Sequence, residues 1–330
     1  MSTQAHRQSV IRGVRAIAAL IAIWPVAASS APSYPERPVR LLLGFAPGGT
    51  ADAIARILSP RLHDALGRPW VVDNRSGAAG NIATEIVAKA NPDGHTLLLF
   101  LSTSLTVSPT LYKLRVDVQK DLQPVIMICA AQYMLVVHQS IKAGTVRELI
   151  DFAKAQPGKL TYASAGIGSP HHLAAELFKT RAGVSMTHVP YKGGGPASAA
   201  ILGNEVQVLF GSLASLHPHV VTGRIKALGV TGLTRSQTVP DVPTIAEGGL
   251  PGFDVTSWLG FMAPAHTPGS IINTIYAATA KILQAPDVRD TLRRDGLEVA
   301  IKNPQQLGAA IKAETQVWAK VIRDANITVE

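Results

Sequence analysis

The chain has 330 residues, of which 47% are hydrophobic and 5% aromatic, which is enough for two domains with sizeable cores. Its formal net charge is +9, but the basic residues are scattered and no run of five or more occurs. Scattered charge with few aromatic side chains argues against a nucleic-acid surface, because such surfaces combine basic patches with aromatic rings that stack on bases.

The first 31 residues show the pattern of a secretory signal. Arg7, Arg12 and Arg15 precede an apolar stretch, Ala16–Ala28, which ends in small residues. A charged start, a short apolar run and small residues at the cleavage point are typical of an export signal. The apolar run has about 13 residues, too few to cross a membrane comfortably. We expect cleavage after Ala28 or Ala31.

The next part of the chain alternates between strand and helix patterns. Apolar runs predict strands at Leu41–Phe45, Trp70–Asp73 and Thr96–Leu101, with a helix over Thr50–Leu66 between the first two. Gly67 is expected to end that helix in a left-handed conformation. After Pro124 comes a mostly apolar segment, residues 125–137, which is long for one strand and is expected to pass between two domains. It contains Cys129, the only cysteine, so an internal disulfide is excluded and a buried, unreactive thiol is expected.

A second alternating unit follows. Further strands are predicted at Leu160–Ser164, Thr187–Val189, Val206–Phe210 and Ala227–Val230, each followed or preceded by a helix pattern. A second long segment, residues 253–263, could cross back, and the tail reads as helices around one short strand. Alternating short strands and helices predict mostly parallel sheets with helices on both faces.

The most informative stretch joins the first strand to the first helix through Pro47-Gly48-Gly49. The first N–H groups of a helix have no partner within it, and the helix dipole places partial positive charge there. Glycines let a ligand approach the backbone, so this loop can hold an anion without a basic side chain. Asp52 and Arg56 lie four residues apart and are expected to pair on the helix.

Other loops rich in glycine, serine or threonine follow strands, where ligands bind in open α/β sheets. They are residues 46–50, 74–80, 102–104, 165–169, 192–195 and 211–212. Each alone fits an ordinary tight turn. Together they favour a binding site in which the helix starts at Thr50 and Ser169 face each other, an arrangement that suits a small dianion.

Enzymatic alternatives find little support in the sequence. The Gly-x-Ser-x-Gly, Gly-x4-Gly-Lys-Ser/Thr and His-Glu-x-x-His patterns are absent. Ser169 with His172 leaves an exported hydrolase or transferase open as an alternative, although Ser169 also suits a helix cap. His171 and His172 point about 100° apart on a helix, so at most one faces the site. We predict no catalytic residue, no metal site and no cofactor.

These motifs resemble the Bug (Bordetella uptake gene) family, the extracytoplasmic solute receptors of tripartite tricarboxylate transporters. The resemblance rests on short motifs in the same order over nearly all of the chain after residue 31. They are Phe45-Ala46-Pro47-Gly48-Gly49-Thr50-Ala51-Asp52 with Arg56, then Asn74, Gly77 and Gly80, Asn91-Pro92-Asp93-Gly94, Gly166-x-Gly168-Ser169-x-x-His172-Leu173, Val189-Pro190-Tyr191-Lys192-Gly193, Trp258-x-Gly260, and Ala263-Pro264-x-x-Thr267-Pro268.

The resemblance implies a periplasmic binding protein-like (type II) Venus flytrap: two doubly wound α/β lobes joined by two crossing strands. The expected division is a signal peptide at 1–31, lobe 1 at 32–124 plus 263–330, and lobe 2 at 125–262. The implied function is capture of a small organic carboxylate in the periplasm for membrane subunits of a tripartite tricarboxylate-type transporter. The receptor is expected to be a monomer with no nucleic-acid partner, and a ligand-sensing module for a receptor is the other alternative.

The resemblance also implies which residues bind ligand. The first loop would contribute mainly backbone groups, the loop at Ser169 would face it, and further positions would complete the pocket. The candidates are Phe45, Ala46, Gly48, Gly49, Asp52, Ser102, Thr103, Ser169, His172, Tyr191 and Gly211. Many family members have Asp or Asn after the strand that ends at Phe210, where this chain has Gly211-Ser212. The missing acidic side chain disfavours an amino acid and favours a carboxylate without an ammonium group.

Overall fold

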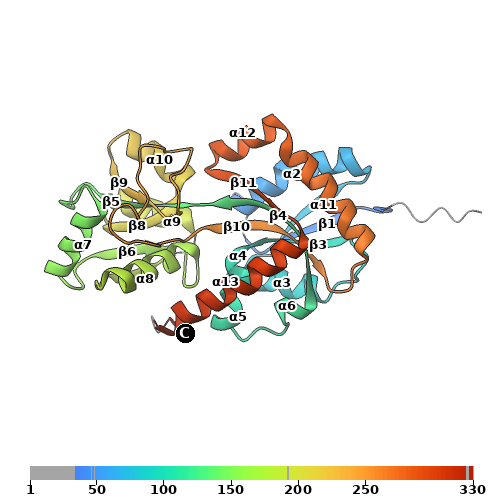
Figure 1. The fold of residues 1–330 in the computed structure, drawn as a ribbon, viewed down its shortest axis with the longest axis horizontal. Coiled ribbons are helices and arrows are strands. Elements are labelled where there is room, and N and C mark those ends of the chain that lie inside the picture. Colours follow the sequence, from blue (N-terminus) through green and yellow to red (C-terminus); the bar gives the residue numbers. More distant parts are fainter. Residues whose placement is uncertain (1–33, 46, 48, 192, 325–326, 330) are drawn as a thin grey trace, which may run out of the picture. The chain divides into compact units, whose positions relative to one another are not determined.

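The computed structural model describes residues 34–330, apart from 46, 48, 192, 325–326 and 330 (Figure 1). Residues Tyr34–Glu330 form one compact unit. The predicted export signal lies outside the described residues. Among the helices of the described ranges, none combines the length and apolar character that a membrane crossing requires.

The first sheet has six strands in the order β11-β4-β10-β3-β1-β2. Its strands are β1 (Val39–Leu43), β2 (Trp70–Asn74), β3 (Thr96–Leu101), β4 (Leu122–Ala131), β10 (Ser257–Pro264) and β11 (Leu297–Lys302). The helices of the same chain segments are α2 (Thr50–Leu66), η1 (Ala78–Gly80), α3 (Asn81–Ala88), α4 (Ser102–Thr106), α5 (Ser108–Leu111), α6 (Val118–Asp121), α11 (Gly269–Gln284), α12 (Pro286–Arg294) and α13 (Pro304–Asp324).

The second sheet has five strands in the order β7-β6-β8-β5-β9. Its strands are β5 (Tyr133–His138), β6 (Thr161–Ser164), β7 (Thr187–Pro190), β8 (Val208–Ser212) and β9 (Ile225–Val230). Its helices are α7 (Val146–Ala155), α8 (Pro170–Ala182), α9 (Gly194–Leu202) and α10 (Leu213–Val221). Two α/β sheets confirm the predicted two-lobe fold class.

The expectation of mostly parallel sheets is wrong. Strands β1, β2 and β3 pair in parallel, as do β6, β7 and β8. Strand β10 runs antiparallel to β3 and β4, β11 runs antiparallel to β4, and β5 runs antiparallel to β8 and β9. The physical reason is that β4, β5 and β10 belong to the crossing segments, which enter a sheet without the crossover helix that a parallel connection needs.

Side-chain alternation along the strands builds an apolar core on both faces of each sheet. Leu41 and Leu43 lie in one core of the first sheet while Leu42 lies in the other. In the second sheet Leu135 packs with α7 and α8, whereas Met134 packs with α9 and α10. This period of two explains why the strands read as continuous apolar runs, since both faces are covered by helices.

The two long apolar segments both connect the sheets. Strand β4 ends at Ala131 in the first sheet, and β5 begins at Tyr133 in the second. On the return, Val255 bonds to Thr231 beside the second sheet before β10 enters the first at Ser257. The lobe boundaries at 124/125 and 262/263 stay a prediction.

Two local predictions illustrate how sequence sets the elements. Helix α2 ends as expected, with Gly67 in the left-handed region and its N–H donating to the His63 carbonyl at 2.7 Å. Cys129 is fully buried in β4, and burial raises the pKa of its thiol to about 12. The cysteine is therefore the unreactive core residue that its apolar surroundings predicted.

Candidate functional site

Three connecting segments meet at the carboxyl ends of the parallel strands β1, β3 and β2. The first loop, residues 44–49, follows β1, the turn 75–80 follows β2, and α4 follows β3. A Cβ on Gly44 would lie 2.3 Å from the Gly80 Cα, and a Cβ on Gly80 would lie 3.3 Å from both Phe45 Cζ and Ser104 Cβ. Only glycines allow this approach of backbone to backbone.

The first loop is braced from behind by Asp52, Asn74 and Arg56, which we call the Asp52 brace. The Asn74 amide donates to the Phe45 carbonyl at 3.0 Å and to Asp52 Oδ1 at 3.2 Å. Arg56 Nε donates to Asp52 Oδ2 at 2.8 Å, which confirms the predicted pair. Asp52 is only 4% exposed, so the brace fixes the loop to the first turn of α2.

The start of α2 is capped by a glycine rather than by a polar side chain. Its N-cap is Gly49, an exposed residue with extended backbone and no side chain that could cap the helix. The first intrahelical bond runs from the Ala53 N–H to the Gly49 carbonyl at 3.0 Å. The N–H groups before Ala53 therefore point toward the loop at the positive end of the helix dipole. Ala46 and Gly48, also predicted to contact ligand, lie outside the described residues.

Ser102 and Thr103 form the first turn of α4 rather than the predicted polar loop. Both are buried, and Ser102 Oγ accepts from the Trp258 N–H at 3.4 Å. The Ser102 carbonyl accepts from the Thr106 hydroxyl at 3.0 Å. Ser102 thus joins α4 to strand β10, and its role as a ligand contact stays a prediction.

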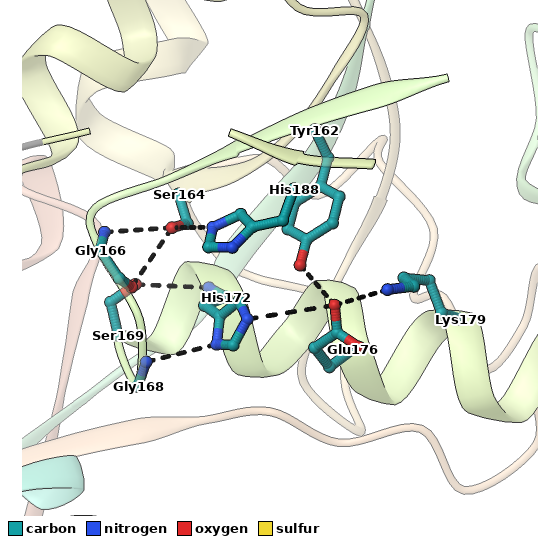
Figure 2. A network of polar contacts seen from close by, with 9 residues as sticks. All are labelled: Tyr162, Ser164, Gly166, Gly168, Ser169, His172, Glu176, Lys179 and His188. Carbon is teal, nitrogen blue, oxygen red and sulfur yellow. Dashed lines mark hydrogen bonds and ion pairs between the residues drawn. The ribbon is translucent and has the colours of Figure 1, made fainter. Parts of the chain in front are cut away.

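The second loop, residues 165–169, precedes α8. Ser169 is the helix N-cap, its hydroxyl accepting from the His172 N–H at 3.4 Å, and Pro170 follows in the first turn, as predicted. Gly168 has a left-handed φ of 77°, and its N–H donates to His172 Nδ1 at 3.3 Å (Figure 2). A Cβ on Gly168 would lie 3.1 Å from Leu111 Cδ1, so this loop packs against α5.

Next to the second loop lies a polar cluster that we call the histidine network: Tyr162, Ser164, His172, Glu176, Lys179 and His188, of which Lys179 and His188 are half-buried and the others buried (Figure 2). Glu176 Oε1 accepts from the Tyr162 hydroxyl and, at 2.7 Å, from Lys179 Nζ. The same oxygen lies 4.0 Å from His172 Nε2. Lys179 therefore balances the charge of the buried carboxylate.

The other end of the second loop is held by Ser164. Its hydroxyl lies 2.6 Å from His188 Nε2, accepts from the Gly166 N–H at 3.0 Å and donates to the Gly166 carbonyl at 3.2 Å. The rings of His188 and His172 stack with centroids 4.4 Å apart, and Tyr162 stacks on His188 at 4.8 Å. Gly166 and Gly168 are thus each fixed by one side chain of the network.

Burial keeps the network histidines neutral. It lowers the pKa of His172 to about 4, with the neighbouring His188 adding to the effect, and it also lowers the pKa of His188. A neutral His172 accepts through Nδ1, as the bond from Gly168 requires. The ring nitrogen that a nucleophilic serine would need is thus occupied, and Ser169 Oγ is bonded to backbone. Within the described residues, this loop shows no hydrogen bond between a serine hydroxyl and the His172 ring.

The remaining candidates lie at other strand ends of the second sheet. Gly211 is buried in β8 opposite Met134 of β5. Tyr191 follows β7, and its hydroxyl donates to Glu205 Oε2 at 3.1 Å. Phe45 and Gly49 thus lie with Asp52 at the start of α2, and Ser169 lies with His172, whereas the Tyr191 hydroxyl bonds to Glu205 of the same sheet's connections.

Sequence reasoning missed two kinds of residue. Glu176 lies four residues after His172, a spacing that places both on one helix face and could have revealed the network. Asn81, by contrast, shows no sequence signal. It is 4% exposed, beside Gly80, and neither atom of its amide has a hydrogen-bond partner within the described ranges. In the same ranges, no group of three His, Cys, Asp or Glu residues is placed to share a metal ion.

Comparison with known proteins places this geometry in context. Residues 54–327 match the family described as "Tripartite tricarboxylate transporter family receptor". A UPF0065 protein from the tcbD-tcbE intergenic region of Pseudomonas sp. strain P51 is 41% identical over 88% of this chain and 87% of its own. Protein BugT of Bordetella pertussis is 37% identical over 89% of this chain and 91% of its own.

Solved structures show the same fold. "R. palustris Rpa4515 with adipate" superposes with a TM-score of 0.83 at 35% identity, covering 89% of this chain and 99% of that one. MatC from Rhodopseudomonas palustris with bound malate superposes with a TM-score of 0.78 at 31% identity. The match covers 88% of this chain and 100% of that one. Both of these similar chains are thus described with a small dicarboxylate.

Proposed function

Because the chain belongs to the tripartite tricarboxylate transporter receptor family, we propose that it is a periplasmic solute-binding protein for a small organic carboxylate. It captures the ligand after export and delivers it to the membrane subunits of a tripartite tricarboxylate-type transporter. It acts as a monomeric receptor and leaves the ligand chemically unchanged. The similar structures with adipate and malate support the carboxylate class.

One observation carries the proposal: α2 begins at Gly49, where no capping side-chain bond is made among the described residues, and Asn74 joins the neighbouring Phe45 carbonyl to Asp52. A carboxylate at this position accepts hydrogen bonds from backbone N–H groups and is stabilised by the helix dipole. Asp52 would repel such a ligand, but its charge is balanced by Arg56. We therefore assign the hydrogen bonds to the ligand carboxylate to the backbone of the first loop rather than to the side chain of Asp52.

The proposed site extends over both lobes. The first loop contributes Phe45, Ala46, Gly48 and Gly49, and the second loop faces it with Ser169, whose N-cap position orients the start of α8. His172 supports the second loop by accepting a hydrogen bond from the Gly168 N–H. Binding closes the two lobes over the ligand by bending the two segments that connect the sheets, as in other hinged receptors.

A thermal-shift panel of mono-, di- and tricarboxylates tests the proposal, because a ligand that binds the folded state raises Tm by mass action. At 100 times Kd the gain is about 2.7 kcal/mol. We expect at least one carboxylate to stabilise the protein and Gly49→Val to abolish that shift by placing a side chain in the anion site. Gly49 has ordinary extended backbone and is exposed, so the variant folds.

Gly269→Val is the matched control. Gly269 begins α11, and a Cβ there would meet nothing within 4 Å. This variant should keep the full ligand-induced shift. No shift with any carboxylate at millimolar concentration would overturn the proposed function. Equal ligand-induced shifts in Gly49→Val and the wild type would instead show that the ligand binds away from the first loop.

A further inference from the structure

Helix α13 contributes buried side chains to the cores of both sheets. Leu307 and Ile311, in its first half, pack in the core of the first sheet together with Phe100 of β3. Trp318 and Ile322, in its second half, pack in the core of the second sheet together with side chains of β5 and β6. These four residues of α13 lie within about 60° of one another around the helix axis, because each residue turns the helix by 100°. We call this helix the α13 strap, since it joins the two lobes in addition to the two crossing segments.

The lobes also meet at both ends of the strap's reach. After the helix ends, the Ile327 N–H donates to the Ile322 carbonyl at 3.0 Å, and the Ile327 side chain is buried in the core of the second sheet. At the turn before β11, a Cβ on Gly296 would lie 3.0 Å from the Leu213 Cβ at the start of α10. Separation of the lobes would therefore have to withdraw apolar side chains of the strap from one of the two cores, which is unfavourable.

Within the described length of α13, Glu314 is the one charged residue on the buried face of the strap. It lies seven residues after Leu307 and four before Trp318, a spacing that places all three on the same face. Glu314 Oε1 accepts from the Thr106 hydroxyl of α4 at 3.3 Å and from the Trp318 indole N–H at 2.9 Å. Its Oε2 accepts from the Trp258 indole N–H. One carboxylate thus binds donors from three elements of the fold.

Trp258 places this junction beside the segments that connect the sheets. It is the second residue of β10, which enters the first sheet on the return crossing, and it lies opposite Ala130 of β4, the strand that leaves this sheet. Its backbone N–H donates to Ser102 Oγ at 3.4 Å. An indole N–H is a donor only, so each of the two buried tryptophan rings requires an acceptor, and Glu314 supplies both.

We propose that the α13 strap holds the two lobes in contact before ligand binds, and that Glu314 is the positioning residue that fixes the middle of the strap to β10. Because the middle is fixed, the helix does not slide along with a moving lobe, and opening must expose Trp318 and Ile322. The ligand-free protein therefore populates the arrangement with touching lobes. A receptor whose binding-competent arrangement is already populated loses less affinity to the conformational change.

Small-angle X-ray scattering of the ligand-free protein tests this inference, because lobe separation raises the radius of gyration. Glu314→Gln keeps the shape of the side chain but replaces one accepting oxygen by an NH2 donor, which leaves one indole N–H without its acceptor. We expect the radius of gyration to rise by about 1 Å, against roughly 19 Å for a compact chain of this length. Ile322→Ala shortens the strap where it meets the second core, leaves Glu314 unchanged, and should produce a similar rise.

Ile275→Val is the matched control. Ile275 is fully buried on α11, in the core on the other face of the first sheet, so this variant loses stability without touching the strap. It should keep the radius of gyration of the wild type while its Tm falls. The same result for Glu314→Gln would show that Glu314 is merely structural and would overturn its positioning role. An unchanged radius for Ile322→Ala would overturn the strap itself. Both readings are made without ligand, so they hold whether or not a carboxylate binds.

Discussion

The two loops of the proposed site are held by supports of opposite character. The Asp52 brace is ionic, with a carboxylate that is 4% exposed paired to an arginine whose side chain is 61% exposed. The histidine network holds Gly166 and Gly168 through neutral groups, and its one carboxylate, Glu176, is neutralised below the loop by Lys179. Both solutions fix a glycine-containing loop and pair the nearby carboxylate with a cation.

The comparison teaches that the supports should respond to different perturbations. Solvent screens an ion pair with an exposed partner, and such a pair contributes little to stability. Buried neutral imidazoles lower the free energy of unfolding at acid pH, because burial opposes their charged form while the unfolded chain binds the proton freely. The first loop should therefore be sensitive to packing of its glycines, and the second loop to acid. Four predictions separate the two, from the largest effect to the smallest.

Gly44→Ala should produce the largest effect. The new Cβ would lie 2.3 Å from the Gly80 Cα, and two backbone segments cannot yield as a flexible side chain can. We expect a loss of at least about 3 kcal/mol in the free energy of unfolding and loss of carboxylate binding. Urea denaturation and calorimetry measure both. Gly269→Ala, at a position with open space, should be nearly silent; equal effects of the two changes would contradict the close approach.

His172→Ala should come next. The change leaves a cavity and removes the acceptor for the Gly168 N–H. It also removes the ring that lies beside the Glu176 carboxylate. We expect about 3 kcal/mol of destabilisation and weaker ligand binding. His172→Asn, whose Oδ1 replaces Nδ1 as acceptor, should recover binding more fully than stability. If both variants bind ligand as the wild type does, the network does not position the second loop.

Acid should destabilise the protein through the network. The pKa of His172 falls from an ordinary 6.5 to about 4 in the folded state, so between these values the unfolded chain binds a proton that the folded chain does not. Stability is therefore complete above pH 6.5 and falls as pH drops, by about 2 kcal/mol at pH 5 from this group. His171 acts in the same direction. Denaturant midpoints between pH 7 and 4.5 measure the loss, and His172→Asn should flatten it.

Changes in the Asp52 brace should have the smallest effects. Asp52→Ala leaves the Asn74 amide bonded to the Phe45 carbonyl, so the loop keeps one anchor. We expect about 1 to 2 kcal/mol of destabilisation with a modest loss of binding. Arg56→Ala should cost less than Asp52→Ala, because the guanidinium is solvent-exposed. Complete loss of binding in Asp52→Ala, equal to that in Gly49→Val, would show that Asp52 contacts the ligand directly.

The parts of the fold that follow from local rules were predictable from the sequence. The bounds of α2, its glycine stop and the Ser169-Pro170 start of α8 depend on residues close in the chain. Strand direction was not predictable in this way, because β5, β10 and β11 pair with strands distant in sequence. The helical Ser102–Thr106 turn was also missed, since its bonds to Trp258 and Glu314 come from distant segments.

The candidate site likewise contains some contacts that local spacing predicts and others that only distant segments of the chain bring together. The Asp52–Arg56 pair has helical spacing and was foreseen, whereas the third member of the brace, Asn74, reaches Asp52 only because β1 and β2 are neighbours. The stack of His172 on His188 joins α8 to β7, which no spacing reveals. Asn81 was found only because the folded chain leaves both polar atoms of its buried amide without partners within the described ranges.

The buried thiol of Cys129 makes the protein convenient for optical sensing. Because the sequence has a single cysteine and its side chain is fully buried, maleimide dyes should not label the native chain. Cysteines introduced at exposed positions, Val71 in β2 and Val221 in α10, would then be the sole reactive thiols. One carries a donor dye beside the first sheet and the other an acceptor beside the second. Lobe closure would be read as a change in energy transfer, without removing any native residue from the core.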